Sequence, residues 1–303
     1  NEINKNFKNF ILKNKIKLIF LKKSFNQVED AKKTITKIKK FYKDKDWVIV
    51  DNYKLGFLWE KKVNHYCKKI FVIDDLENKK HQCSLFLNQN LFKKKINMNN
   101  FLKKKPKLLI GPKYALLDEN FNKLRRKIKL RKKIKNIMLF FGASDKKNMT
   151  DKCTNILLDI IPKNVKLNLV IGGTNENRKK INEKYHHNKK INIYFNLPNL
   201  AKIMKKADVF IGSGGVTTWE RCCLRLPSIV ISTAKNQESH SRYLSDKNAI
   251  KYLGNQKKLN ESQIKREFMN LFKGNSLKKL SINSSKITDG LGCIRVYKEI
   301  LKN

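Results

Sequence analysis

Short, unbroken apolar runs alternate with helical stretches along this chain, and that alternation limits the folds open to it. Stretches with apolar residues three and four apart, such as 35–38, 157–161 and 200–204, lie between many of the runs and predict helices. The runs are rich in Ile, Val, Leu and Phe and cover residues 16–21, 47–51, 70–74, 108–111, 137–142, 167–172, 191–195, 209–212 and 228–232. Runs of this kind are typical of parallel strands buried on both faces. The sequence therefore predicts an α/β fold with parallel sheets.

The 303 residues are enough for two domains, and a basic stretch at 118–134 marks a boundary between them. This stretch lacks a strand signal and separates two strand-rich blocks. We interpret it as a solvated connector helix, with a nucleic-acid patch as the alternative. The predicted domains are residues 1–117, which form a short block, and residues 135–303, which end in an amphipathic helix over 289–301.

The charge balance suggests a general attraction for anions. Lys and Arg number 69 against 25 acidic residues, for a formal net charge of +44. Only nine of the 69 are Arg, the residue that reads guanine and clamps phosphate in a bidentate manner. The lysines are also spread over the whole chain among many Asn and Ile residues. We therefore expect no specific nucleic-acid partner.

The cysteine spacing bears on metal binding, and the lengths of the apolar runs bear on the cellular compartment. The six cysteines form no C-x-x-C pair, which favours reduced thiols. His65 and Cys67, like His81 and Cys83, repeat a His-x-Cys pattern, but that spacing matches no common zinc site, so we expect packing and no metal. There is neither an 18-residue apolar run nor a signal-peptide core. We expect a cytoplasmic protein without a membrane span.

Glycine and small polar residues gather where the predicted strands end, which is where open α/β sheets bind ligands. Gly142 and Gly172 are each the last residue of a run, and the richest segment is GSGGVTTWE at 212–220. Gly214 and Gly215 allow a ligand to approach the backbone closely, and the helix that follows offers free N–H groups to a phosphate.

Glu220 lies just inside that helix, where it could accept two hydroxyl hydrogens of a ribose. The spacing excludes a P-loop and disfavours a nicotinamide site. The alternative is a purely structural turn with threonine caps and a solvated glutamate.

Several phrases of the sequence resemble a known family. GSGGVTTWERCCLRLPSIVIS resembles the nucleotide-sugar motif of GT-B proteins such as MurG. Together with VIVDNYKLGFLWE, FVIDDLENKKHQCSLFLNQN, GPKYALL, FFGASDKKN and AKNQ, it is similar to the PseG family, the UDP-2,4-diacetamido-2,4,6-trideoxy-β-L-altropyranose hydrolases of pseudaminic acid synthesis. The resemblance runs from about Val48 to the end.

The resemblance implies a GT-B-like fold of two Rossmann-type domains with an interdomain cleft. It also implies a hydrolase that needs no metal and releases UDP by water attack at the anomeric carbon. We expect a monomer without a cofactor. Its UDP-binding residues would be Gly142, Gly172, Gly214, Gly215, Val216, Thr217 and Glu220, with Asn236 and Gln237 on the sugar-diphosphate side.

Two polar positions in the first domain follow predicted strands. Tyr53 is the candidate for a catalytic or substrate contact, with a half-buried tyrosine at the sheet edge as the alternative. Asp74 and Asp75 resemble a metal-binding pair, but before Leu76 we expect Asp74 to cap a turn.

The sequence departs from the family at its start. The family's G-x-G-H-x-x-R loop, which carries the presumed base, has no counterpart here, because neither a Gly before Gly56 nor a His before His65 is present. We therefore expect an incomplete amino-terminal domain, as a fragment of a longer gene product or as a truncated relative with weak turnover. A glycosyltransferase using a UDP-N-acetyl sugar, a non-catalytic UDP-sugar binder and a basic nucleic-acid-binding protein remain the alternative functions.

Overall fold

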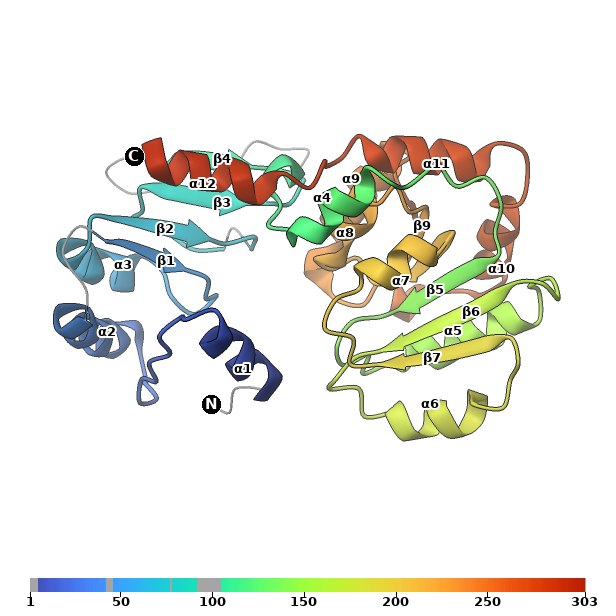
Figure 1. Ribbon diagram of the computed structural model, residues 1–303, viewed down its shortest axis with the longest axis horizontal. Coiled ribbons are helices and arrows are strands. Elements are labelled where there is room, and N and C mark those ends of the chain that lie inside the picture. The colour runs from blue at the N-terminus through green and yellow to red at the C-terminus, as the bar shows by residue number, and fades with distance from the viewer. Residues whose placement is uncertain (1–4, 42–45, 77, 92–104, 303) are drawn as a thin grey trace. The chain divides into compact units, whose positions relative to one another are not determined.

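The computed structural model describes residues 5–41, 46–76, 78–91 and 105–302, and the chain divides into two compact units (Figure 1). The smaller unit comprises residues 1–87 and 96–108, and the larger unit comprises 88–95 and 109–303. The division thus falls near residue 109, ahead of the boundary expected at 117. Each unit is described by itself below.

The smaller unit is built on a sheet with the strand order β1-β2-β3-β4. Its elements are α1 (Lys5–Lys13), α2 (Gln27–Phe41), β1 (Trp47–Val50), α3 (Phe57–Val63), the 3-10 turn η1 (Asn64–Tyr66), β2 (Lys69–Ile73), β3 (Leu85–Asn88) and β4 (Lys107–Ile110). The pairs β1–β2 and β2–β3 are parallel, and β3 is buried at all four positions. Helices α2 and α3 are joined by a hydrogen bond, 2.9 Å long, from Trp59 Nε1 to Asp30 Oδ1.

The strand predicted at 16–21 is wrong. Residues 16–20 have no regular secondary structure, and the side chains of Ile16 and Phe20 are more than half exposed. A strand requires a neighbour to satisfy its backbone groups, and among the described residues this run is paired with none. Conversely, Leu85–Asn88 forms β3 although the pattern analysis did not include it.

The larger unit carries a six-stranded sheet in the order β10-β9-β8-β5-β6-β7, and all neighbouring strands are parallel. Its strands are β5 (Asn136–Phe140), β6 (Lys166–Ile171), β7 (Ile191–Phe195), β8 (Val209–Gly212), β9 (Ser228–Ser232) and β10 (Lys251–Asn255). Its helices are α4 (Glu119–Arg125), α5 (Met149–Leu158), α6 (Arg178–Tyr185), α7 (Ala201–Lys206), α8 (Thr217–Cys223), α9 (Glu238–Asp246), α10 (Glu261–Asn270), α11 (Ser276–Ser285) and α12 (Gly292–Lys302), with 3-10 turns η3 (Pro112–Tyr114), η4 (Lys235–Gln237) and η5 (Gln256–Lys258).

Two apolar cores cover the two faces of this sheet. Successive residues of a strand point to opposite faces, so Ile137 and Leu139 join the core beneath α5, α6 and α10. Met138 joins the core formed with α4, α7, α8 and α9, which includes Phe210 and Trp219. The chain runs outward from β5 to β7 and then returns to β8, so the strand order reverses between β5 and β8. In open α/β sheets, ligands bind at the carboxyl ends of the strands that flank such a point.

The segment 118–134, expected to be a solvated connector, lies within the larger unit. Phe121 is buried in the core of that unit, and Arg131 is only 6% exposed. The Arg131 guanidinium donates to the carbonyl oxygens of Met204, Ala207 and Leu224 at 2.6 to 3.3 Å. These carbonyls end α7 and α8, where a cation is stabilised by the helix dipole. Part of the basic run therefore anchors helix ends.

Candidate functional site

Glycine-rich loops leave β5 and β8 at the point where the strand order reverses. A Cβ on Gly212 would lie 1.9 Å from the carbonyl oxygen of Phe140, so this position accepts glycine alone. Gly142 has a φ of +96°, a backbone conformation that other residues rarely adopt. Gly172 directly follows the neighbouring β6, and a Cβ there would meet Ala143 backbone atoms at 2.4 Å. These glycines allow the ends of three adjacent strands to approach one another closely.

The Gly214–Gly215 turn between β8 and α8 packs against the start of α9. A Cβ on Gly214 would lie 2.6 Å from Ser241 Oγ and 3.3 Å from Val230 Cγ1. The buried His240 ring contacts the Gly214 carbonyl oxygen through Nε2 at 2.5 Å. Gly215 is more open, because a Cβ there would have Gln237 Nε2 as its nearest neighbour, at 4.0 Å. The turn is thus fixed by its contacts with α9, while the side chain of Val216 is 56% exposed.

Gln237 and Asn236 lie beside this turn on η4. The Oε1 atom of Gln237 accepts a hydrogen bond from the Thr233 amide at 3.0 Å, which orients its amide group. Asn236 is exposed. Of the two residues predicted for the sugar-diphosphate side, Gln237 is the one that borders the glycine turn.

Glu220 stands on α8 with one carboxylate oxygen buried. Its Oε2 atom has no hydrogen-bond partner among the described residues. Burial raises the pKa of this carboxyl group to about 7, with Arg221 opposing the rise and Asp118 adding to it. An unpaired buried carboxylate oxygen is costly, so its presence marks a place for a hydrogen-bond donor.

A cavity of about 430 Å³ lies in front of Glu220. Its walls come from α4, from the ends of β5 and β6, from the loop after β7 and from α8: Asp118, Phe121, Phe140, Ala143, Val170, Ile171, Gly172, Gly173, Asn196, Leu197, Pro198, Asn199, Leu200, Thr217 and Glu220. Gly172, Thr217 and Glu220 thus line one cavity. Gly142 directly precedes Ala143, which lines the cavity, and the segment 214–216 directly precedes Thr217. Whether these residues bind UDP stays a prediction.

Arg221 supports the turn from inside the fold, and the pattern analysis did not identify it. This side chain is 1% exposed, and its guanidinium donates to the Ser213 carbonyl oxygen at 3.0 Å and to Thr218 Oγ1 at 3.0 Å. It also stacks on the Phe210 ring, 3.8 Å from the ring centroid. Burial lowers its pKa to about 10. The sequence signal was an arginine directly after Glu220, in a helix with no other charged residue.

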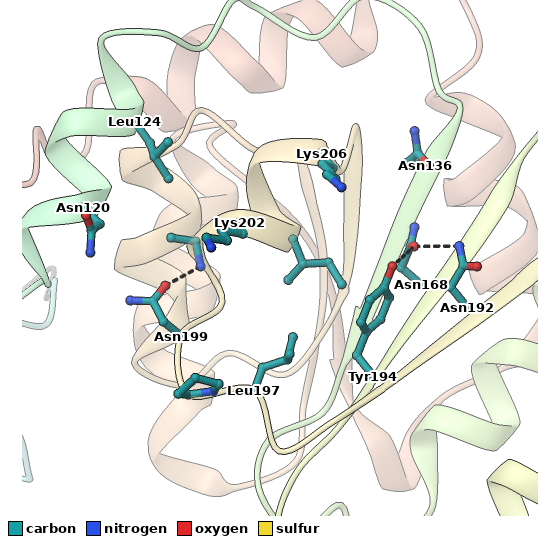
Figure 2. A pocket seen from close by; sticks show the side chains of 13 residues that line it. Asn120, Leu124, Asn136, Asn168, Asn192, Tyr194, Leu197, Asn199, Lys202 and Lys206 are labelled. Carbon is teal, nitrogen blue, oxygen red and sulfur yellow. Dashed lines mark hydrogen bonds between the residues drawn. The ribbon is translucent and has the colours of Figure 1, made fainter. Parts of the chain in front are cut away.

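A second cavity, of about 780 Å³, is lined by residues of α4, α7, β5, β6 and β7 (Figure 2), and it shares Leu197, Pro198 and Asn199 with the first cavity. Asn136 is the first residue of β5, and Asn192 is the second of β7. As Figure 2 shows, Asn192 and Tyr194 both donate to Asn168 Oδ1, at 3.1 and 3.5 Å. The smaller cavity is the better candidate site, because it adjoins the glycine turn and the unpartnered carboxylate.

Tyr53 lies in the smaller unit, just after β1, and is 56% exposed. Its phenol donates to Asp75 Oδ1 at 2.6 Å, and its carbonyl oxygen accepts from Lys79 Nζ at 2.7 Å. Burial and the neighbouring carboxylates raise the pKa of the phenol well above its ordinary value. Tyr53 therefore keeps its proton at neutral pH and is a poor general base.

The acidic pair after β2 caps a turn, as expected. Asp74 Oδ1 accepts from the Leu76 amide at 2.8 Å, while Oδ2 pairs with Lys79 Nζ at 3.1 Å. Within the described parts of the chain, no group of three or more His, Cys, Asp and Glu side chains is placed to hold a metal ion. Among the described helices, none is both long and apolar enough to cross a bilayer.

Sequence comparison places these features in a family. The glycosyltransferase family 28 C-terminal domain matches residues 120–290, which is more than half of the 303 residues. An uncharacterized protein of Methanocaldococcus jannaschii, MJ1062, is 29% identical over 208 residues, covering 66% of this chain and 43% of that protein. The spore coat polysaccharide biosynthesis protein SpsG of Bacillus subtilis is 25% identical over 191 residues, covering 61% of this chain and 56% of that protein.

A third relative is the UDP-2,4-diacetamido-2,4,6-trideoxy-β-L-altropyranose hydrolase of Campylobacter jejuni. It is 28% identical over 203 residues, which cover 66% of this chain and 71% of the hydrolase. The matched regions thus span about half the length of the first two relatives and more of the hydrolase.

Solved structures agree on the fold. MurG of Acinetobacter baumannii superposes with a TM-score of 0.65 at 14% identity, covering 98% of this chain and 88% of MurG. A putative UDP-N-acetylglucosamine 2-epimerase of Listeria monocytogenes also gives 0.65, at 11% identity over 97% of this chain and 85% of the epimerase. The chain has a GT-B-like fold with parallel sheets, and it belongs to the family of the glycosyltransferase family 28 C-terminal domain.

Proposed function

We propose that the larger unit binds the UDP portion of a UDP-sugar in the cavity in front of Glu220. The diphosphate would lie against the backbone amides of the segment 214–217, and the ribose hydroxyls would donate to the Glu220 carboxylate. The buried Glu220 Oε2 atom, which has no partner in the described parts of the chain, carries this proposal, because a ribose hydroxyl could supply the hydrogen bond. The name of a similar protein, the Campylobacter jejuni hydrolase, makes a nucleotide sugar the leading ligand class.

We further propose that the whole protein hydrolyses a UDP-linked 2,4-diacetamido-2,4,6-trideoxyhexose and releases UDP and the free sugar. The similarity to the Campylobacter jejuni hydrolase supports this substrate class. Water would attack the anomeric carbon, and the bond from that carbon to the UDP oxygen would break. Tyr53 is the proposed substrate contact of the smaller unit, and Gln237 and Asn236 are those beside the diphosphate.

A glycosyltransferase that uses a UDP-N-acetyl sugar is the second candidate, and the family match favours it. The two functions differ in the group that receives the sugar. A hydrolase releases UDP from the sugar nucleotide in buffer alone, whereas a transferase requires an added acceptor. Measuring UDP release with and without candidate acceptors separates them.

The ribose contact can be tested by calorimetry with UDP and 2′-deoxy-UDP. A charge-assisted hydrogen bond contributes about 1.5–3 kcal/mol, so we expect the chain to prefer UDP roughly ten- to hundredfold. Glu220→Ala should remove most of this preference, whereas Glu176→Ala, which changes an exposed glutamate of the same unit, should keep it. Comparing two nucleotides of equal charge cancels the general attraction of a chain with a net charge of +44. Equal affinity of the unaltered chain for both nucleotides would refute the ribose role.

A further inference from the structure

Four ionisable side chains form a chain of contacts inside the smaller unit. Glu60 on α3 is fully buried, while His81 and Asp74 are 2% and 3% exposed. His81 Nδ1 lies 2.7 Å from Glu60 Oε1, and His81 Nε2 lies 3.5 Å from Asp74 Oδ2. Lys79 Nζ completes the series at 3.1 Å from the same Asp74 oxygen. We call Glu60, His81, Asp74 and Lys79 the ion network.

Within the ion network, His81 and Asp74 stabilise each other's charged form. Burial alone would lower the pKa of His81, but the carboxylates of Asp74 and Glu60 outweigh it and raise that pKa to about 9. Burial alone would likewise raise the pKa of Asp74, but the nearby His81 ring, the hydrogen bond from the Leu76 amide and the Lys79 ammonium group bring it to about 2. At neutral pH, a protonated His81 therefore faces an ionised Asp74, with 3.5 Å between Nε2 and Oδ2.

The ion network continues into Tyr53. Lys79 Nζ, which pairs with Asp74, also donates to the Tyr53 carbonyl oxygen at 2.7 Å. At the other end of the residue, the phenol donates to Asp75, the neighbour of Asp74, at 2.6 Å. Tyr53 is thus held at its backbone and at its hydroxyl group by the turn that the ion network fixes, although its side chain is 56% exposed.

Stability alone is a weak reason for such an arrangement. Desolvating several charges costs free energy that their attraction only partly returns, and apolar replacements often serve stability as well. The ion network does join four separate segments: α3, the end of β2, residues 79–81 and the loop after β1. Fixing one exposed phenol with respect to the sheet is a task that directional contacts can perform and apolar packing cannot.

We infer that His81 and Lys79 are positioning residues for Tyr53. They hold its phenol so that the hydroxyl group donates to Asp75 and the phenol oxygen can accept a hydrogen bond from a ligand. A phenol that donates to a carboxylate has only acceptor capacity left. Tyr53 would therefore recognise an O–H or N–H donor, such as a sugar hydroxyl or the N–H of an acetamido group. This last step, the sugar as donor, rests on the proposed function, whereas the positioning itself does not.

The positioning can be tested by NMR on the full chain labelled with ¹³C at tyrosine Cζ, with Tyr53→Phe assigning the resonance. In the unaltered chain, the contact with Asp75 should keep Tyr53 protonated beyond the ordinary tyrosine pKa of about 10. Lys79→Met and His81→Gln should bring the pKa of Tyr53 down toward that ordinary value, because the turn that carries Asp75 loosens. Loss of the Lys79 charge by itself would raise the pKa of a phenol, so a fall reports lost positioning.

Lys80→Met, which changes an exposed neighbouring lysine, is the matched control, and Asp75→Asn shows the shift expected when the acceptor itself is changed. An unchanged Tyr53 titration in Lys79→Met and His81→Gln, with a clear shift in Asp75→Asn, would overturn the inference. If His81→Gln fails to fold, Lys79→Met decides alone, because its side chain lies nearer the surface. UDP affinity is measured on the same samples: absent UDP binding refutes the proposed function, whereas an unchanged titration refutes the positioning.

Discussion

The affinity of the chain for UDP should depend on pH through Glu220. The carboxylate is the form that accepts hydrogen bonds from two ribose hydroxyls, and burial raises its pKa in the free protein to about 7. Below pH 7 the group must lose a proton before UDP binds. UDP should therefore bind more weakly as the pH falls.

The size of the effect follows from the pKa. Each pH unit below about 7 costs a factor of ten in affinity, or about 1.4 kcal/mol. Between pH 8 and pH 5.5, the dissociation constant should rise roughly 30-fold. The rise ends where the bound carboxylate itself takes up a proton.

Calorimetry at five pH values between 5.5 and 8 measures this dependence, with Glu220→Gln as the control. The terminal phosphate of UDP also titrates near pH 6, but it does so equally for both proteins, so the difference between their curves isolates Glu220. Parallel curves for the two proteins would refute the reasoning.

The same pKa predicts how the contribution of Glu220 to the stability of the ligand-free protein changes with pH. The folded-state pKa lies above the ordinary value of 4.5, so this stability is fully present below pH 4.5 and is lost as the pH rises through about 7. At pH 8, the free energy of unfolding of Glu220→Gln in urea titrations should therefore exceed that of the parent by an amount on the order of 2 kcal/mol. This difference should vanish near pH 4.5.

Two further predictions concern the scaffold of the larger unit. Arg131→Met should lower the free energy of unfolding by about 3 kcal/mol in urea titrations, because three buried carbonyl groups lose their donor, whereas the exposed Arg126→Met should change it little. Equal effects of the two would contradict the anchoring role. Gly214→Ala should lower the free energy of unfolding by about 1–3 kcal/mol, because its Cβ would lie 2.6 Å from Ser241 Oγ, and Gly215→Ala should lower it less. The opposite ranking would show that the turn is not packed as described.

Much of the larger unit could be predicted from local pattern. The runs at 137–142, 167–172, 191–195, 209–212 and 228–232 all contain strands, because a parallel strand covered on both faces must be apolar throughout. β10 was missed because KYLGN mixes Lys, Gly and Asn with few apolar residues. The run at 16–21 shows the converse limit, since an apolar segment becomes a strand only where a neighbour pairs with it.

The candidate site likewise has features that the sequence predicted and features that only the tertiary structure decided. The sequence by itself determined the alternation of strands and helices, because the spacing of apolar residues is a property of consecutive positions. It also placed a Gly-Gly turn before Glu220, while the neighbours that exclude a Cβ at Gly214 come from distant segments. Only the tertiary structure decided that the Glu220 oxygen is buried without a partner among the described residues, that Arg131 joins two helix ends and that His81 stands between Glu60 and Asp74. Each of those contacts joins residues from different elements, and burial and pairing arise only when those elements pack together.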